Sequence, residues 1–254
     1  MFSWRAEVRP GIWVAFTNVA AGNLALHVGD DPAQVHRRRE LLEQAAGLSP
    51  RRFQFMNQVH GKEVAVVGGG APAGEPGTPA ADAPTADALT ADAMVSAGGP
   101  LAVMVADCVP IVLVGERAAG RDAPPVFGVV HAGRPGLAAG VVPAAVAQLR
   151  EHGATGISAW IGPSICGQCY EVPDSMRAEV AESVPAAWCT TAQGTPGLDL
   201  PAGVRSQLAA EGVAVEYSGG CTREDAGLYS YRRDGRTGRF AGLVWTATPA
   251  GALT

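Results

Sequence analysis

LAVMVADCVPIVLVGERAAGRDAPPVFGVVHAG, residues 101–133, is the stretch around which the fold is organised. It contains two short Val-rich runs, Leu101–Val105 and Val126–Val130, each bounded by Gly or Pro. Runs of this length and composition are typical of buried strands. A reactive residue follows each run, Cys108 after the first and His131 after the second. We therefore expect two buried strands that end at chemically active side chains.

A third reactive residue, His60, follows the run Phe53–Val59, which we also predict to be a strand. Two imidazoles and one thiolate form a ligand set that zinc and copper prefer. Since His60, Cys108 and His131 lie far apart in sequence, they can meet only through the tertiary fold. The spacing alone leaves a second interpretation open, in which both histidines are satisfied polar residues and Cys108 is a small buried apolar residue.

The same residues also permit nucleophilic chemistry. A cysteine beside a histidine can act as an activated thiolate, so Cys108 could work with His131 or His60. The sequence does not separate this interpretation from the metal site, because thiolate and neutral imidazole are also the metal-ligand forms. Asp107, next to Cys108, could orient a ligand or act as a base, or be an ordinary turn residue.

Three further cysteines lie outside this set. Cys166 and Cys169 form a CxxC pair, which is typical of redox motifs and of half a zinc ribbon, but also fits a tight turn before Tyr170. The same alternatives hold for Cys221, in the segment GGCTRED.

Composition narrows the classes of function. The chain has 254 residues and a net charge of −5, without a basic stripe, which argues against nucleic-acid binding. No apolar run is long enough to span a bilayer, and the N-terminal segment lacks the pattern of a secretory leader. The five cysteines are an odd number in a chain of this size, so we expect free thiols and a cytoplasmic location.

The remaining segments predict an α+β fold with mixed sheets in a single domain over residues 1–254, because strands and helices follow one another without βαβ alternation. A helix should begin after Asp31 as N-cap, with Pro32 in the first position, and run to about Ala46 before Gly47, with Arg37–Arg39 mostly solvated. Other strands are predicted at 12–16, 64–67, 157–161, 213–217 and 240–245, other helices at 143–151, 174–183 and 201–211, and a loop at 184–198. Residues 68–91 are rich in Gly, Ala and Pro and predict a flexible surface loop. The segment ADAMV, at 91–95, nearly repeats ADALT, at 86–90, and is interpreted as a duplication within that loop.

A set of motifs in this order resembles the YfiH-like family, also called the polyphenol oxidase or purine nucleoside phosphorylase family of laccase-domain proteins. The motifs are NLALHVGDDP at 23–32, NQVHG at 57–61, ADAMVS at 91–96, ADCVPIVL at 106–113, VHAG at 130–133, IGPSICGQCYEV at 161–172, CT at 221–222 and YSYRRDG…TGR at 229–239. The resemblance covers nearly the whole chain. It implies a layered α/β/α sandwich with mixed sheets, related to the bacterial cytotoxic deamidase toxins.

The resemblance also implies a metal site at His60, Cys108 and His131, the three residues reached above from the strand ends. The metal would be zinc, with copper in laccase-like assays. The implied activity is phosphorolysis of adenosine, inosine and methylthioadenosine, with adenosine deamination and phenol oxidation as side activities. Phosphorolysis requires a cationic phosphate pocket. The predicted substrate-binding residues are Arg232, Arg233, Arg39 and Asn57, and Asp107 is included with the three ligands as catalytic. For Arg232 and Arg233 a second interpretation stays open, in which they belong to a solvent-exposed turn with structural ion pairs.

Two alternatives to this function stay open. One is a cysteine hydrolase or deamidase that uses Cys108, and the other is a non-enzymatic role in cell-wall or division quality control. The family usually reads VHAGWRG, whereas this chain reads VHAGRPG, with Arg134 in place of Trp and Pro135 in place of Arg. This departure predicts altered substrate contacts beside an intact metal site.

Overall fold

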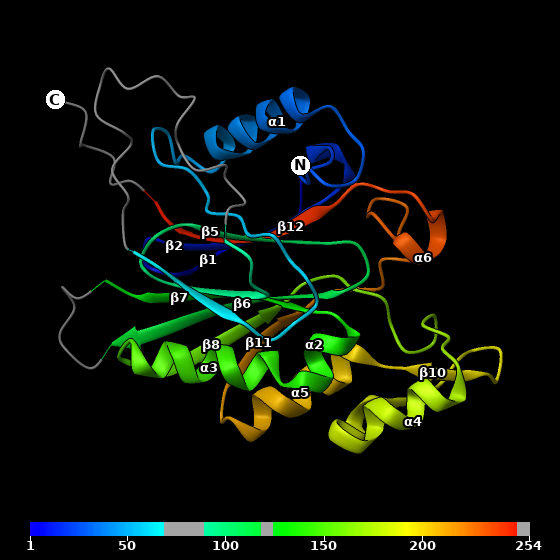
Figure 1. The fold of residues 1–254 in the computed structure, drawn as a ribbon. Helices are drawn as coiled ribbons and strands as arrows, with labels where there is room; N and C mark the ends of the chain where they lie inside the picture. The colour runs from blue at the N-terminus through cyan, green and yellow to red at the C-terminus, as the bar shows by residue number, and fades with distance from the viewer. Residues whose placement is uncertain (69–88, 118–123, 248–254) are drawn as a thin grey trace, which may run out of the picture.

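A computed structural model of the chain describes residues 1–68, 89–117 and 124–247 (Figure 1). Two sheets form its centre. The smaller sheet is antiparallel and has the order β1-β2-β12-β5. Its strands are β1 (Phe2–Arg9), β2 (Ile12–Thr17), β12 (Phe240–Thr246) and β5 (Leu101–Val105).

The larger sheet is mixed and has the order β11-β8-β6-β7-β4-β3. Its two outer pairs are parallel and its inner pairs are antiparallel. Its strands are β11 (Ala214–Ser218), β8 (Ala154–Ile161), β6 (Val109–Arg117), β7 (Val126–Ala132), β4 (Ala93–Ala97) and β3 (Val64–Val67).

Helices cover the outer face of each sheet. Figure 1 shows α1 (Pro32–Ala45) over the smaller sheet, and α2 (Arg134–Ala139), α3 (Val141–Glu151) and α5 (Leu200–Ala210) over the larger one. The remaining elements are α4 (Asp174–Ser183), α6 (Tyr231–Asp234), the 3-10 turns η1 (Val19–Ala21) and η2 (Pro185–Ala187), and the hairpin of β9 (Trp188–Thr190) and β10 (Pro196–Leu198). The predicted α+β fold with mixed sheets is confirmed, and the sheets form two layers between the helices.

Three apolar cores separate the four layers. Leu42 and Trp245 belong to the core under α1, Phe16 and Phe127 to the core between the sheets, and Leu149 to the core under α3. Strand β7 alternates between two of these cores and is buried on both faces. This burial explains why its sequence is a continuous apolar run and not an alternating pattern.

Several predicted elements are confirmed at nearly the predicted bounds. The helix α1 begins after the N-cap Asp31, whose side chain accepts a hydrogen bond from the Ala33 N–H, and Gly47 follows with a φ of 70°. The predicted strands at 12–16, 64–67, 101–105, 126–130, 157–161, 213–217 and 240–245 and the helices at 143–151, 174–183 and 201–211 are also present.

Four expectations are wrong. Residues 53–59 form no strand: their ladder contacts are two isolated bridges, Gln54 with Leu101 and Asn57 with Thr90. Side-chain hydrogen bonds also hold the segment, among them those between Gln58 and the backbone of Met104. The segment 91–95 is not loop, because most of it lies in β4. Residues 184–198 are not plain loop, since they contain η2 and the hairpin β9-β10. Arg39 is only 4% exposed, and its guanidinium donates to the carbonyl of Leu24 instead of facing solvent.

Three elements of the structure, β1, β6 and α2, are not predicted from the sequence. Most of the predicted loop at 68–91 lies outside the described residues. None of the helices in the described part of the chain combines the length and the apolar character that crossing a bilayer requires.

Candidate metal centre

His60, Cys108 and His131 meet at one point, although the residues before His60 form no strand. Their ligand atoms all lie within 4.8 Å of one another. The Cys108 Sγ is 3.8 Å from the His60 Nε2, and the two imidazole rings meet edge to face with centroids 4.7 Å apart. Cys108 comes from the turn between β5 and β6, His131 from β7, and His60 from the segment before β3.

The buried carboxylate of Asp92, just before β4, organises two of the ligands. Its Oδ1 lies 2.8 Å from the His131 Nδ1, so the Nε2 of His131 is the nitrogen left for the centre. The same carboxylate accepts hydrogen bonds from the backbone N–H groups of Val59, His60 and Gly61. These bonds hold His60 at a φ of 62°, a left-handed conformation that is costly for a residue with a side chain. One carboxylate therefore fixes the orientation of one histidine and the backbone of the other.

Two glycines leave the room that the ligands occupy. A Cβ on Gly133 would lie 2.6 Å from the His60 ring and 3.3 Å from the Cys108 sulfur. A Cβ on Gly136 would lie 2.6 Å from the carbonyl oxygen of Gly61. The start of α2 therefore packs directly against the ligand cluster, and the sequence HAGRPG keeps glycine where the approach is closest.

The charge states of Cys108 and His131 depend strongly on each other. Burial alone would raise the pKa of the Cys108 thiol, but the charge of His131 and hydrogen bonds with both histidines lower that pKa to about 6. Burial alone would lower the pKa of His131, but the Cys108 thiolate and the Asp92 carboxylate raise it to about 9. At neutral pH these values favour a thiolate that faces an imidazolium. A zinc ion would take the place of that imidazolium proton, since zinc binds the thiolate and the neutral ring.

This donor set fits a zinc ion well. Three protein ligands of the types His, Cys and His leave one coordination position open, which is the arrangement of catalytic zinc sites. The contact between Asp92 and His131 is the carboxylate–histidine pair that commonly orients a zinc ligand.

Asp107 has a bracing role in the structure. Its φ is 86°, and its two carboxylate oxygens accept hydrogen bonds from the Thr222 hydroxyl and from the backbone N–H of Arg232, both at 2.6 Å. Asp107 thereby ties the turn that carries Cys108 to the segment that carries α6. These two bonds hold the turn in place, and the catalytic role of Asp107 stays a prediction.

A pocket of about 440 Å³ opens beside the three ligands. Its walls carry three cationic side chains, Arg134, Arg232 and Arg239, and two tyrosines, Tyr170 and Tyr231. The Arg232 guanidinium lies over the Tyr170 ring at 4.9 Å. The remaining lining residues are His27, Gln58, Met104, Val105, Ala106, Asp107, Pro135, Ile165 and Leu200. The pocket therefore joins a group of side chains able to hold a soft metal to a cationic, aromatic wall.

Of the four predicted substrate-binding residues, only Arg232 lines this pocket. Arg39 lies on the buried side of α1, and its guanidinium is 3.7 Å from the centre of the Phe55 ring. Arg233 holds its own loop together, because its guanidinium donates to the carbonyls of Thr222, Asp225 and Leu228.

Asn57 is exposed and donates from its side-chain amide to the Thr90 hydroxyl. It does not line the pocket either. Arg39, Arg233 and Asn57 thus lie outside the pocket lining, and their role in substrate binding stays a prediction.

Three further residues of the site, Asp92, Arg239 and Tyr170, are not predicted from the sequence. Asp92 lies in the segment interpreted as a loop duplication. Its position just before a buried apolar run is the one feature of the sequence that marks it as a candidate site residue. Arg239 and Tyr170 belong to motifs quoted above, but no local pattern separates a pocket-facing side chain from its neighbours. Arg134, which the sequence marks only as a departure from the family motif, lines the pocket and supplies a cation to its wall.

The CxxC pair lies behind this pocket. Cys166 and Cys169 form a tight turn before Tyr170, as one interpretation predicted, with the Cys169 N–H bonded to the Cys166 carbonyl. The turn also meets Cys221 and Glu224, and these four residues form a second group able to hold a metal. Burial raises the pKa of Cys166, and burial together with the neighbouring thiols raises the pKa of Cys169 to about 12.

The chain is similar to known proteins over most of its length. The family described as multi-copper polyphenol oxidoreductase laccase matches residues 12–247 of the chain. A purine nucleoside phosphorylase of Streptomyces coelicolor is 51% identical over 229 residues, which cover 88% of this chain and 87% of the relative. A purine nucleoside phosphorylase of Mycobacterium tuberculosis strain H37Rv is 43% identical over 226 residues, which cover 88% and 84%.

Solved structures agree over nearly the full length. YlmD from Geobacillus stearothermophilus has a TM-score of 0.77 and 31% identity, covering 98% of this chain and 100% of that protein. YfiH from Bacillus licheniformis has a TM-score of 0.74 and 26% identity, covering 92% of each chain. The resemblance to YfiH-like proteins is confirmed by these neighbours.

Proposed function

Because the chain belongs to the multi-copper polyphenol oxidoreductase laccase family, we propose that it is a metal-dependent purine nucleoside phosphorylase. The proposed substrates are adenosine, inosine and methylthioadenosine, each with inorganic phosphate. The observation that carries the proposal is the meeting of a His–Cys–His ligand set with three arginines in one pocket. The names of the Streptomyces and Mycobacterium relatives support the same activity.

The cationic wall suits the phosphate. In phosphorolysis a phosphate oxygen forms a bond to C1′ of the ribose, the N-glycosidic bond breaks, and the purine leaves with a proton. Guanidinium groups bind phosphate through paired hydrogen bonds and hold the anion in place for attack. Arg134, Arg232 and Arg239 supply these groups, while the rings of Tyr170 and Tyr231 offer faces on which a purine stacks.

His60, Cys108 and His131 would hold the metal, which we propose to be zinc. When bound, zinc supplies a Lewis acid at the floor of the pocket, where it stabilises negative charge that develops during the reaction. Asp92 keeps the His131 ring in the orientation that binding requires. Burial and the Cys108 thiolate raise the pKa of Tyr170, so its hydroxyl stays protonated and able to donate a hydrogen bond.

We propose adenosine deamination and phenol oxidation as side activities of the same centre. A zinc-bound water suits deamination, because zinc lowers the pKa of water to about 7. Phenol oxidation would need copper in place of zinc. A true multicopper oxidase requires several copper centres rich in histidine, whereas the chain has five histidines and the second metal-type group in the described residues has none.

The direct test measures release of free purine from inosine and adenosine with phosphate. We expect turnover by the zinc-loaded chain and none by Cys108→Ala, with Cys189→Ala as the matched control that keeps activity. Arg239→Met should raise the KM for phosphate by about tenfold or more, while the exposed Arg236→Met leaves it unchanged. Unchanged turnover in Cys108→Ala would rule out the assigned role of the ligand set.

A cysteine hydrolase or deamidase is the second candidate. Cys108, His131 and Asp92 stand in the order of a nucleophile, a base and an orienting carboxylate, and the lowered pKa of Cys108 suits a nucleophile. A chelator separates the two candidates. Activity that survives complete removal of metal but is lost on alkylation of Cys108 favours the hydrolase.

We also propose a cytoplasmic location, since all five cysteines are free thiols in the structure.

A further inference from the structure

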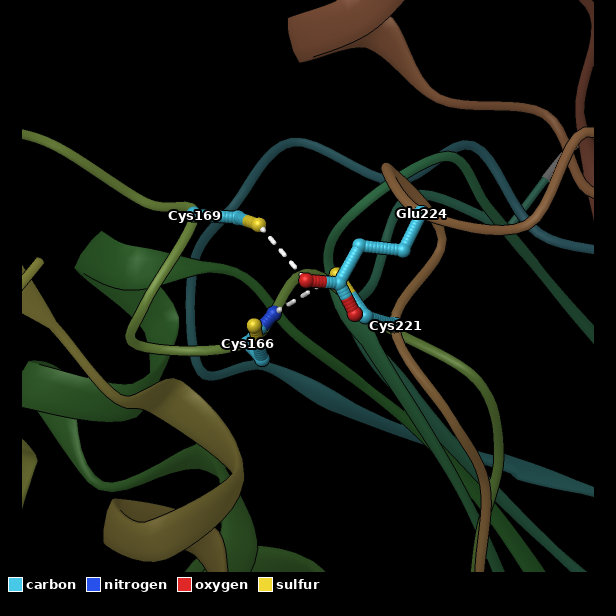
Figure 2. A group of neighbouring side chains, drawn as sticks. All are labelled: Cys166, Cys169, Cys221 and Glu224. Carbon is cyan, nitrogen blue, oxygen red and sulfur yellow. Dashed lines mark hydrogen bonds between the residues drawn. The ribbon is translucent and has the colours of Figure 1, made fainter. Parts of the chain in front are cut away.

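Behind the pocket wall, three cysteines and one glutamate from two distant segments converge (Figure 2). Cys166 and Cys169 come from the turn after β8, whereas Cys221 and Glu224 come from the loop after β11. One ligand atom from each of the four side chains lies within 4.8 Å of the others. The three cysteine side chains are half-buried, and the glutamate closes the group from the solvent side.

Backbone contacts hold the two segments in register around the sulfurs. Ser164 and Cys221 form a bridge in which the Thr222 N–H donates to the Ser164 carbonyl. The Cys166 N–H points at the Cys221 Sγ at 3.5 Å, and Cys169 Sγ lies 3.5 Å from a carboxylate oxygen of Glu224. An N–H aimed at sulfur is the contact that outer-shell groups commonly make to a metal thiolate.

We propose that Cys166, Cys169, Cys221 and Glu224 form a structural zinc site, separate from the centre at His60, Cys108 and His131. Four protein ligands make a closed tetrahedral set, as structural zinc sites have, whereas the pocket centre offers three ligands and an open position. The CxxC spacing is the one that zinc sites commonly use for two of their thiolates. With Zn–S bonds of about 2.3 Å, tetrahedral ligands lie about 3.8 Å apart, so the four atoms need to approach by roughly 1 Å at most.

The charge around the group fits a bound dication. Three thiolates and a carboxylate carry more negative charge than the ion neutralises, and a cation beside them reduces the excess. The Arg223 guanidinium donates to the Cys169 carbonyl and supplies that cation. A disulfide would instead use two of the sulfurs and leave the third without a partner.

The site would brace the substrate pocket from behind. The first segment also carries Ile165 and Tyr170, which line the pocket. The second carries Thr222, whose hydroxyl holds Asp107, and leads into α6, where Arg232 faces the pocket. A metal that ties the two segments together therefore fixes one wall of the pocket without touching the substrate.

The test uses Co²⁺, whose bonds to thiolate give a charge-transfer absorption band in the near ultraviolet. The full chain is prepared as Cys108→Ala, which removes the thiolate of the pocket centre, and is titrated with Co²⁺ after metal removal. We expect a thiolate band that saturates at one equivalent per chain. The same protein isolated with zinc should contain one tightly held ion by elemental analysis.

Two further variants locate the band. Adding Cys221→Ser to Cys108→Ala should abolish or greatly weaken it, while adding Cys189→Ser, a cysteine outside both groups, should leave it unchanged. A Cys108→Ala protein with neither band nor bound zinc would overturn the proposal. So would a count of thiols in the unfolded, unreduced protein that shows two of these cysteines joined as a disulfide. Since every reading is taken without the pocket thiolate, the result does not depend on whether the chain is a phosphorylase.

Discussion

At the scale of single residues, Asp92 does the most to shape the pocket centre. Its carboxylate fixes the His131 ring and accepts three backbone N–H groups from residues 59–61. Burial would raise the pKa of Asp92, but its bonds to His131 and to these backbone groups lower it. The carboxylate is therefore ionised at neutral pH and acts as a fixed acceptor.

Asp92→Asn should weaken zinc binding by about 10- to 100-fold, because an amide has one acceptor oxygen where the carboxylate has two. Competition with a chromogenic chelator measures the affinity. The control is Asp174→Asn, an exposed aspartate on α4. An Asp92→Asn protein with the zinc affinity of the unsubstituted chain would show that the orienting contact is dispensable.

The pKa of Cys108 gives a second test at this scale. A thiol whose pKa is lowered to about 6 is mainly thiolate above that pH and loses its reactivity as the pH falls through it. In metal-free protein, alkylation of Cys108 by iodoacetamide should therefore rise through about pH 6. Peptide mass spectrometry follows each cysteine separately.

Cys169 serves as the internal control in the same samples, since its raised pKa keeps it a thiol until strongly alkaline pH. If Cys108 and Cys169 gain reactivity over the same alkaline range, the thiolate–imidazolium pair is absent.

At the scale of elements, the short helix α2 and the segment before β3 are packed so closely that side chains are excluded between them. The contact at Gly133 is with the ring of His60, whereas the contact at Gly136 is with backbone. A methyl group on residue 133 can be accommodated only if the imidazole of His60 moves.

Gly133→Ala should therefore displace the His60 ring by roughly 1 Å and lower zinc affinity by about tenfold or more, while the fold persists. Isothermal titration with zinc, combined with circular dichroism, separates the two effects. Gly68→Ala is the matched control, because a Cβ there meets nothing within 4 Å. Equal zinc affinity in both variants would contradict the packing described for α2.

The elements also show where sequence reasoning succeeded and where it could not. Strands β5 and β7 were predicted because both faces of each are buried, which makes their sequences continuous apolar runs. The strand β6 was not predicted, because it contains Pro110 and proline is rare inside strands. Pro110 is tolerated because it lies at the end of β6, opposite His131. The segment 53–59 has the apolar composition of a strand because Phe53, Phe55 and Met56 are buried, but its backbone pairs with neighbouring strands only at isolated bridges.

The meeting of His60, Cys108 and His131 was predictable, since these residues are chemically distinctive and follow apolar runs. The pocket wall was not. Arg39 and Arg233 are as cationic in sequence as Arg239, and only the fold decides that Arg239 lines the pocket while the other two do not. The convergence of Cys221 on the CxxC turn likewise depends on the parallel pairing of β11 with β8.

At the scale of the whole molecule, packing between the two sheets outweighs the ion pairs that join them. Phe127 is fully buried in the core between the sheets. Arg9 in β1 pairs with Glu116 in β6 and Glu216 in β11, but its side chain is 33% exposed and those of its partners more so. Exposed pairs contribute about 1 kcal/mol or less, whereas burial of an aromatic ring contributes several times that.

Phe127→Ala should lower the free energy of unfolding by about 3–5 kcal/mol, because it leaves a cavity in a close-packed core. Arg9→Met should change it by about 1 kcal/mol or less. Urea denaturation of the two variants under the same conditions gives both values. A larger loss in Arg9→Met than in Phe127→Ala would mean that charge and not packing joins the layers.

The central claim is that the four-layer fold brings His60, Cys108 and His131 to one metal ion, and anomalous diffraction at the zinc edge from zinc-loaded crystals tests it most directly. The account predicts an anomalous peak about 2.0–2.3 Å from the His60 Nε2, the Cys108 Sγ and the His131 Nε2. Zinc bound in those crystals with no peak shared by these three atoms would contradict it.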